Sequence, residues 1–260
     1  MNESNLGRRE VLDEVELKKL NNIRQKKLNQ MDSFEELSYE QIMKMANMHN
    51  EILNNIHMSR GDVYLYSENE KLELVEDLYN TYMSDFRDIT LKQVVDFSKN
   101  VAGVEKSQDL LIYDWEKMYI DQANQILFDS SDIGDLNMSL DKLVGDVKSD
   151  NRKMFKTPIL LYIETLKESS FYWASVEEGG SGLGFSLLKK RSPYFMSNKK
   201  GKKNWKNVAI ADAQGMTTGM LGVAAYGAWG VMFGPAGFAL TGGAFVWVAV
   251  ESAMASALFG

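Results

Sequence analysis

One segment of the chain gathers most of the side chains that could bind a soft metal ion. Residues 43–58 contain both histidines of the protein and several thioethers: Met43, Met45, Met48, His49, His57 and Met58. Thioether and imidazole groups together can hold Cu(I). Methionine also fills irregular gaps in helical cores, and the two histidines lack the spacing of a zinc or di-iron site. We therefore favour core packing and expect neither a metal nor another cofactor.

The sequence contains no arrangement typical of an enzyme. There is no phosphate-binding loop, no nucleophile elbow and no convincing Ser–His–Asp set, and the chain has no cysteine. Without cysteine there is neither a disulfide nor a thiolate metal site. We expect no catalytic residues and predict that the protein is not an enzyme.

A strongly basic segment extends from residue 189 to residue 206. It has eight positive charges and no negative one. The preceding residues 1–188 are acidic, with a net charge of −13. Each Lys or Arg near an anionic leaflet contributes about 1 kcal/mol of binding. The aromatic residues Tyr194, Phe195 and Trp205 could stack on nucleic-acid bases, but the acidic remainder and the adjacent apolar tail favour lipid. We predict no nucleic-acid partner, and docking on an anionic membrane through Lys189, Lys190, Arg191, Lys199, Lys200, Lys202, Lys203, Trp205 and Lys206.

The chain changes character after the basic segment. From Ala213 to Val250 no residue is charged, and Gly234-Pro235-Ala236-Gly237 interrupts this run near its middle. The first arm, Met216–Phe233, would be about 27 Å long as a helix, close to the roughly 30 Å of a bilayer core. The second arm extends from Phe238 to Gly260. This pattern predicts a hydrophobic helical hairpin over residues 207–260 that enters a membrane.

Small residues lie along one face of each predicted arm. Close approach of helix backbones over such faces drives helix association in lipid, whereas in water each glycine costs up to about 1 kcal/mol relative to alanine. The pattern therefore favours a membrane and predicts a homo-oligomer on insertion. The residues that we assign to the hairpin and its packing are Gly215, Gly219, Gly222, Gly227, Gly230, Gly234, Pro235, Gly237, Gly242, Ala249, Ala253, Ser256 and Gly260.

Glu251 is the one charged residue of the predicted second arm. On a helix it would project away from the small-residue face, towards a pore lumen, a partner or the headgroups. An ionisable side chain at membrane depth is a functional candidate. If the last turns emerge from the bilayer, Glu251 is simply solvated, and both alternatives stay open.

The acidic residues 1–178 show helical periodicity throughout. Capping boxes at Ser33 and Ser38 precede a helix that we expect to end near His57, and further helices are expected at 69–86, 89–101, 105–128, 138–149 and 153–175. In the helix at 105–128 we expect a core face formed by Leu110, Leu111, Trp115, Met118, Tyr119 and Ile126. We predict an all-α fold with an amphipathic helical bundle at 1–178, a flexible Gly-rich and polybasic linker at 179–206, and the hairpin at 207–260.

Amphipathic helices followed by an uncharged Gly/Ala-rich hairpin resemble the pore-forming domain of colicins and related bacterial toxins. The glycine spacing that begins Gly215-Met216-Thr217-Thr218-Gly219 also resembles that of glycine-zipper membrane proteins, including some bacteriocins. The resemblance covers about residues 207–260 and is one of architecture, and no receptor-binding or translocation domain is visible. It implies a hairpin hidden in the soluble form, and an immunity or carrier protein as a partner.

We therefore predict a membrane-inserting, pore-forming antibacterial toxin or effector. Two other interpretations remain: the hairpin is the permanent core of a soluble bundle, or it serves a non-toxic assembly or secretion-associated protein by packing against a partner or itself. Met1-Asn2-Glu3-Ser4 leads into a charged segment without a signal-peptide pattern. We expect synthesis in the cytoplasm, followed by membrane association or secretion by a non-Sec route.

Overall fold

The computed structural model describes residues 37–61, 63, 66–82, 114–152, 156–186 and 204–225. All regular structure in these ranges is helical, so the chain is all-α wherever it is described, as the sequence predicts. The helices are α2 (Tyr39–Arg60), α3 (Glu68–Tyr82), α5 (Asp114–Asp129), α6 (Ile133–Ser149), α7 (Thr157–Trp173) and α9 (Asn204–Ala225), with a short 3-10 helix, η3 (Val176–Glu178).

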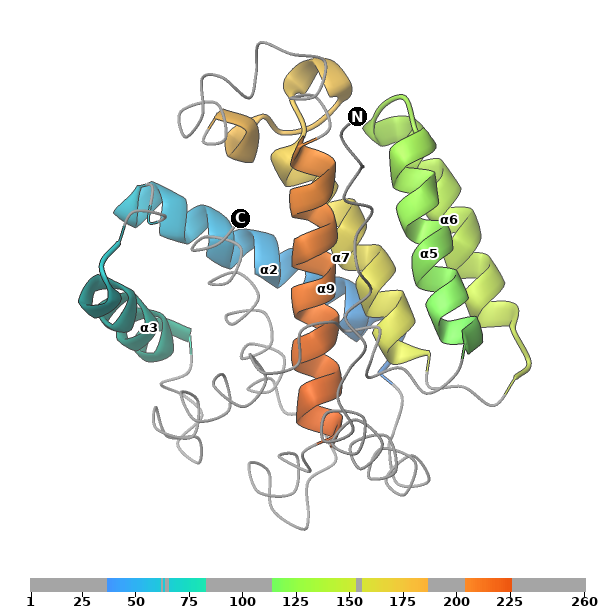
Figure 1. The fold of residues 1–260 in the computed structure, drawn as a ribbon, viewed down its shortest axis with the longest axis horizontal. Coiled ribbons are helices and arrows are strands. Elements are labelled where there is room, and N and C mark those ends of the chain that lie inside the picture. The colour runs from blue at the N-terminus through green and yellow to red at the C-terminus, as the bar shows by residue number, and fades with distance from the viewer. Residues whose placement is uncertain are drawn as a thin grey trace, which may run out of the picture.

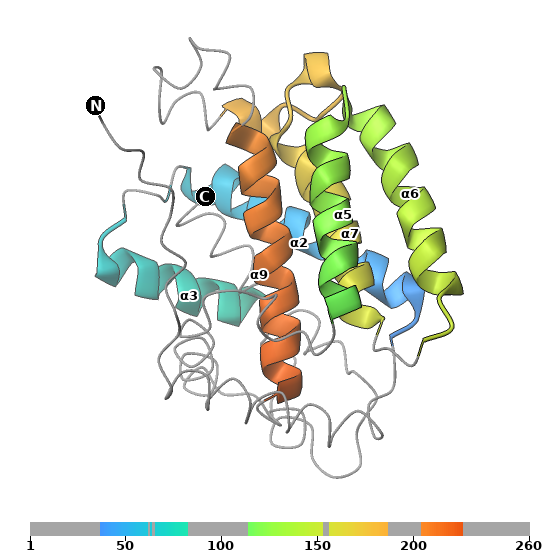
Figure 2. The ribbon, with the colours of Figure 1, turned by 45° about the vertical axis from the view of Figure 1, so that its right-hand side comes forward.

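Helix α7 is the centre of the described structure. It packs against α2, α5, α6 and α9, and every side chain from residue 157 to residue 166 is buried. A helix that is buried on every side over ten successive residues lies in the interior of the protein. In Figures 1 and 2, α9, α5 and α6 run alongside α7, and α2 crosses this group of helices. We call the four helices α2, α5, α6 and α7 the helical body.

Helix α2 begins at the predicted capping box and ends at Arg60, three residues beyond the expected end near His57. The Ser38 side chain accepts a hydrogen bond from the Gln41 backbone N–H, and the Gln41 side chain accepts one from the Ser38 N–H, which is the predicted capping box. Its C-cap is Gly61, whose φ of 71° favours glycine. Its buried residues include Ile42, Met45, His49 and Ile52.

The expected start of α6 was wrong. Helix α6 begins at Ile133 rather than 138, because the Asp132 carboxylate accepts a 2.9 Å hydrogen bond from the Asp135 N–H and caps the helix despite Gly134 in its first turn. That bond lowers the pKa of Asp132.

The core face of α5 differs from the predicted one. Met118 is exposed, Trp115 and Ile126 are half-buried, and Leu110 and Leu111 lie outside the described residues. Of the predicted face, Tyr119 is buried, and the other buried residues are Glu116, Ile120, Ala123 and Leu127. The buried face of α5 is therefore formed largely by small and branched side chains that pack against α7, α6 and α9. The larger Trp115 ring lies at the edge of this face, and the Arg152 guanidinium lies over it, 4.9 Å from the ring centroid.

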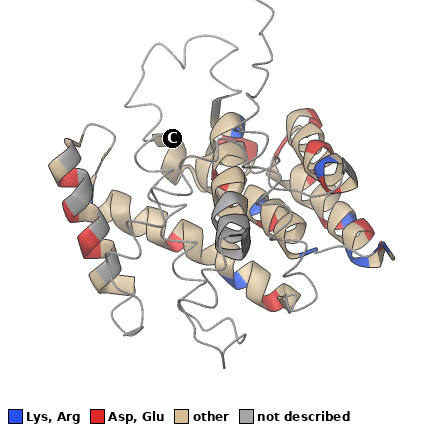
Figure 3. Ribbon diagram, turned by 60° about the horizontal axis from the view of Figure 1, so that its bottom comes forward, with Lys and Arg blue, Asp and Glu red and all other residues tan. Residues whose placement is uncertain are grey.

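Acidic side chains are prominent on the described surface. On α3, Glu70, Glu73, Glu76 and Asp77 are exposed, and Figure 3 shows acidic positions along this helix and acidic and basic positions mixed on α5 and α6. The described surface thus shows the acidic character expected for the first part of the chain.

Candidate functional site

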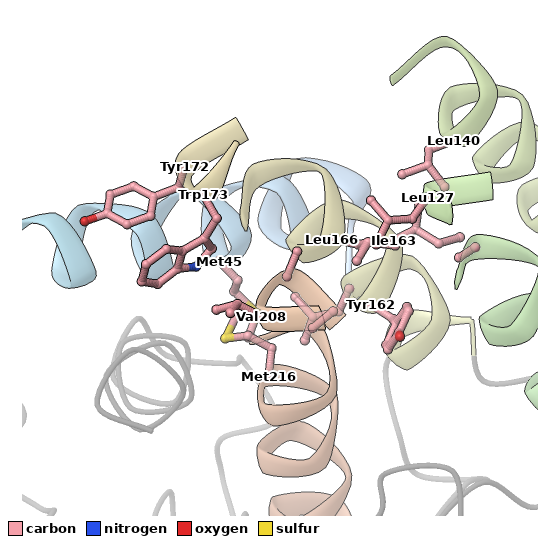
Figure 4. Close-up of a cluster of buried hydrophobic side chains, with 14 of the residues drawn as sticks. Met45, Leu127, Leu140, Tyr162, Ile163, Leu166, Tyr172, Trp173, Val208 and Met216 are labelled. Carbon is pink, nitrogen blue, oxygen red and sulfur yellow. The ribbon is translucent and has the colours of Figure 1, made fainter. Parts of the chain in front are cut away.

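Helix α9 is where the apolar tail joins the helical body. Residues Val208, Ala209, Ala213 and Met216 are buried at helical spacing. Figure 4 shows Val208 and Met216 in one cluster of buried side chains with Met45 of α2 and Leu166 of α7. The beginning of the predicted hairpin is therefore packed into the core, and its small side chains allow α9 to approach α7 closely.

The one charged residue in the described part of the predicted hairpin, Asp212, is buried between α9 and α7. The residue is 2 % exposed. The Ser169 hydroxyl and the Trp173 indole N–H both donate to Oδ2 of Asp212, the latter at 2.8 Å. A buried carboxylate is tolerated when it accepts such hydrogen bonds. Asp212 thus fixes the rotation and register of α9 on α7.

Two residues that we assigned to lipid docking, Trp205 and Lys206, are held within the helical body. Trp205 is 3 % exposed. The ammonium of Lys206 donates to the carbonyls of Leu127 at 2.7 Å, of Ser130 at 3.1 Å and of Phe128 at 3.4 Å. These carbonyls belong to the end of α5 and the turn after it, where a cation is favoured by the helix dipole. In this structure, neither residue presents its side chain to a membrane surface.

Aromatic residues connect the end of α7 to α2. His57 Nδ1 lies 2.6 Å from the Tyr172 hydroxyl, and the two rings stack at 6.0 Å between their centroids. Trp173 packs edge-on against both rings. Because Trp173 also bonds to Asp212, α2, α7 and α9 meet at this end of the helical body through one continuous set of side chains.

The glycine-rich stretch after α7 forms a compact turn. The Ser181 and Gly182 N–H groups donate to the carbonyls of Phe171 at 2.7 Å and Ala174 at 3.1 Å. A Cβ on Gly180 would lie 2.5 Å from the Ala174 carbonyl oxygen, and one on Gly184 would overlap the Trp173 ring. These glycines let the chain fold closely over the end of α7, so residues 179–186 pack as part of the helical body. This differs from the flexible linker that we expected there.

A second polar cluster lies at the start of α2 and along α7 and α6. The Tyr39 hydroxyl donates to Glu164 Oε1 at 2.6 Å, and Lys167 bonds to Glu164 and, at 2.7 Å, to Asp141. Burial and the bond to Glu164 raise the pKa of Tyr39 well above its usual value. Burial lowers the pKa of Lys167, but its two carboxylate partners outweigh this and leave it raised. The Lys148 ammonium lies 2.9 Å from the Tyr39 ring centroid. We interpret this cluster as structural, because each group has a defined partner.

Most of the methionines and histidines of residues 43–58 pack in or at the edge of the core. Met45, His49 and His57 are buried, Met48 is half-buried, and Met43 and Met58 are exposed. Among the residues that the structure describes, no group of three His, Asp or Glu side chains is placed to hold a metal ion.

Most of the assigned tail lies outside the described residues. Gly215, Gly219 and Gly222 lie on α9. The remaining tail residues, from Gly227 through Pro235 to Glu251 and Gly260, and the basic residues Lys189 to Lys203 fall in undescribed ranges. The sequence alone predicts no role for Ser169, Trp173 or Asp212. An acidic residue inside an otherwise apolar helix was the available signal for Asp212, but its partners become visible only in three dimensions.

None of the helices in the described ranges is both long and apolar enough to cross a bilayer. No protein-family model matches the chain, and comparisons with curated proteins and with solved structures found no significant match.

Proposed function

We propose that the protein is a membrane-inserting, pore-forming antibacterial toxin or effector whose C-terminal hairpin enters the bilayer. In this proposal an acidic helical bundle carries the hairpin, and copies of the hairpin associate in the membrane. The single observation that carries the proposal is the charge-free run from Ala213 to Val250, broken by Gly234-Pro235-Ala236-Gly237.

The packing of α9 supports this proposal. The first residues of the hairpin lie against α7 rather than in solvent, through Ala209, Ala213 and Met216. A protein that delivers an apolar hairpin must keep it from aggregating in water, since exposed apolar patches promote association. Docking its first turns on a preformed core is one way to do so.

The basic segment would guide the protein to its target. Residues 189–203 contribute seven positive charges immediately before α9, and such a segment attracts anionic lipid headgroups. Trp205 and Lys206 do not contribute to this docking in our proposal, because they are held against the helical body. The small-residue faces then drive association of the inserted helices, and we propose no enzymatic activity and no cofactor.

Potassium efflux from anionic vesicles, measured beside vesicle co-flotation, tests this proposal. A pore predicts that the full-length protein both floats with the vesicles and releases potassium. Binding without efflux would favour the assembly or secretion-associated function, in which the hairpin contacts a protein partner or another copy. No binding at either neutral or mildly acidic pH would show that the hairpin is a permanent core element.

A further inference from the structure

Helix α9 combines two chemically different parts. Residues 204–217, which we call the anchor segment, include the buried residues Trp205, Asp212 and Met216, which pack against the helical body. The charge-free run that could enter a membrane begins at Ala213, within this same continuous helix. The question is whether the whole of α9 leaves the helical body on insertion, or only the part beyond the anchor.

Three contacts hold the anchor segment. Trp205 is buried, Lys206 bonds to the end of α5, and Asp212 accepts from Ser169 and Trp173 of α7. Two of these residues are charged and would be costly at membrane depth. Thr217, also buried, turns its hydroxyl onto the Ala213 carbonyl at 2.8 Å, so its polar group is satisfied within the helix.

The tail does not need the anchor segment in order to span a bilayer. From Thr218 to Phe233, helix rise gives roughly 24 Å, and from Gln214 about 30 Å, which is the thickness of the hydrocarbon core. A slightly thinned bilayer or a few frayed residues of the anchor would cover the difference. A first arm that begins at Thr218 therefore leaves Trp205, Lys206 and Asp212 in place.

We infer that the anchor segment is a permanent tether, which keeps its contacts with α5 and α7 while the tail beyond it enters the membrane. This inference rests on the proposed function. It means that the helical body stays at the bilayer surface, attached directly to the first membrane helix, and that the side chains of Trp205, Lys206 and Asp212 never enter the hydrocarbon.

A covalent link between α9 and α5 tests the tether. The chain has no cysteine, so the double variant Ser130→Cys/Lys206→Cys introduces a unique pair at positions that Lys206 already bridges. A short bis-maleimide that spans the length of a lysine side chain is added before lipid, and mass spectrometry verifies the link. The matched control is the same variant treated with a mono-maleimide.

The tether predicts that the linked protein releases potassium from anionic vesicles within about twofold of the control. A loss of tenfold or more in the linked protein, with the control active, would overturn the tether and leave the proposed pore function standing. Absence of release from the control and from wild-type protein alike would overturn both.

A second measurement does not depend on the link. Single variants Asn207→Cys, at an exposed position of the anchor segment, and Leu221→Cys carry an environment-sensitive fluorophore. On addition of vesicles we expect a blue shift and quenching by lipid-phase quenchers at residue 221 and neither change at residue 207. Quenching at both positions would contradict the tether.

Discussion

The indole N–H of Trp173 donates a 2.8 Å hydrogen bond to Oδ2 of Asp212 and thereby joins the last turn of α7 to the middle of α9. The Ser169 hydroxyl, one turn earlier on α7, donates to the same oxygen. Both donors and the acceptor are buried. One carboxylate therefore satisfies two buried donors and fixes the position of the helix from which the apolar tail continues.

Replacing Asp212 with alanine leaves the Ser169 hydroxyl and the Trp173 N–H without their acceptor in the core. An unsatisfied buried polar group costs about 1–3 kcal/mol, so we expect Asp212→Ala to lower the free energy of unfolding by at least about 2 kcal/mol in urea denaturation. Asp212→Asn, which keeps one acceptor oxygen, should lose less. Asn207→Ala, at an exposed position of the same helix, is the control and should change stability by under about 0.5 kcal/mol. Equal stability of Asp212→Ala and wild type would contradict this role of Asp212.

Lys206 satisfies carbonyl groups at the end of α5, and removing its ammonium should loosen that end. We expect Lys206→Met to lower stability by roughly 1 kcal/mol, within the range for a cation at a partly buried helix C-terminus. Amide hydrogen exchange should accelerate selectively near residues 127–130. The control is Lys142→Met on the exposed face of α6. Uniform exchange changes in both variants would show that Lys206 has no specific capping role.

Two glycine-to-alanine substitutions, one in the glycine-rich turn and one in α6, should change stability in opposite directions. Gly180→Ala places a Cβ 2.5 Å from the Ala174 carbonyl oxygen, and we expect a loss of about 1–3 kcal/mol from overpacking. Gly145→Ala lies in the interior of α6 with no atom within 4 Å of its Cβ. It should gain up to about 1 kcal/mol from helix propensity. Thermal unfolding of both variants checks this, and a neutral Gly180→Ala would mean that the turn is not tightly packed.

Tyr162 should make the protein sensitive to alkali. Burial raises the pKa of Tyr162 well above the ordinary value of a tyrosine, and the nearby Asp121 charge raises it further, although the hydrogen bond with Asn124 lowers it. The folded pKa is thus above the unfolded one, so the stability contribution is complete below pH 10 and is lost as the pH rises beyond it. Urea denaturation between pH 8 and about pH 11 should show a shallower decline for Tyr162→Phe than for wild type. Identical slopes would exclude Tyr162 as a source of this loss.

Local signals in the sequence predicted much of the helical structure. The Ser38–Gln41 capping box is read from neighbouring residues and occurs in the structure, and α2 ends within three residues of the expected position. The start of α6 was missed because Gly134 suggests a break, while the cap at Asp132 outweighs it. The low helix propensity of Gly134 and the capping bond of Asp132 change helix stability by similar amounts, so the sequence alone does not decide between them.

The contacts of α9 could not be predicted in the same way. Lys206 follows Lys202 and Lys203 and shares their charge, so the sequence groups it with the basic segment. Its partners, the carbonyls near Ser130, lie more than seventy residues earlier in the chain. The Asp212 site likewise depends on Ser169 and Trp173, which come together with it only when α9 packs on α7.

Release of a trapped dye from anionic liposomes tests the central claim most directly. Full-length protein is compared with the double variant Gly219→Leu/Gly222→Leu and with a chain that ends at Ala225, which keeps all of α9. Leucine at these positions prevents close helix approach, and the shortened chain lacks most of the predicted hairpin. We therefore expect both comparison proteins to lose dye release while the full-length protein is active. If the full-length protein neither binds nor permeabilises the liposomes at neutral and mildly acidic pH, or if the chain ending at Ala225 releases the dye equally well, the hairpin is not a membrane-inserting element.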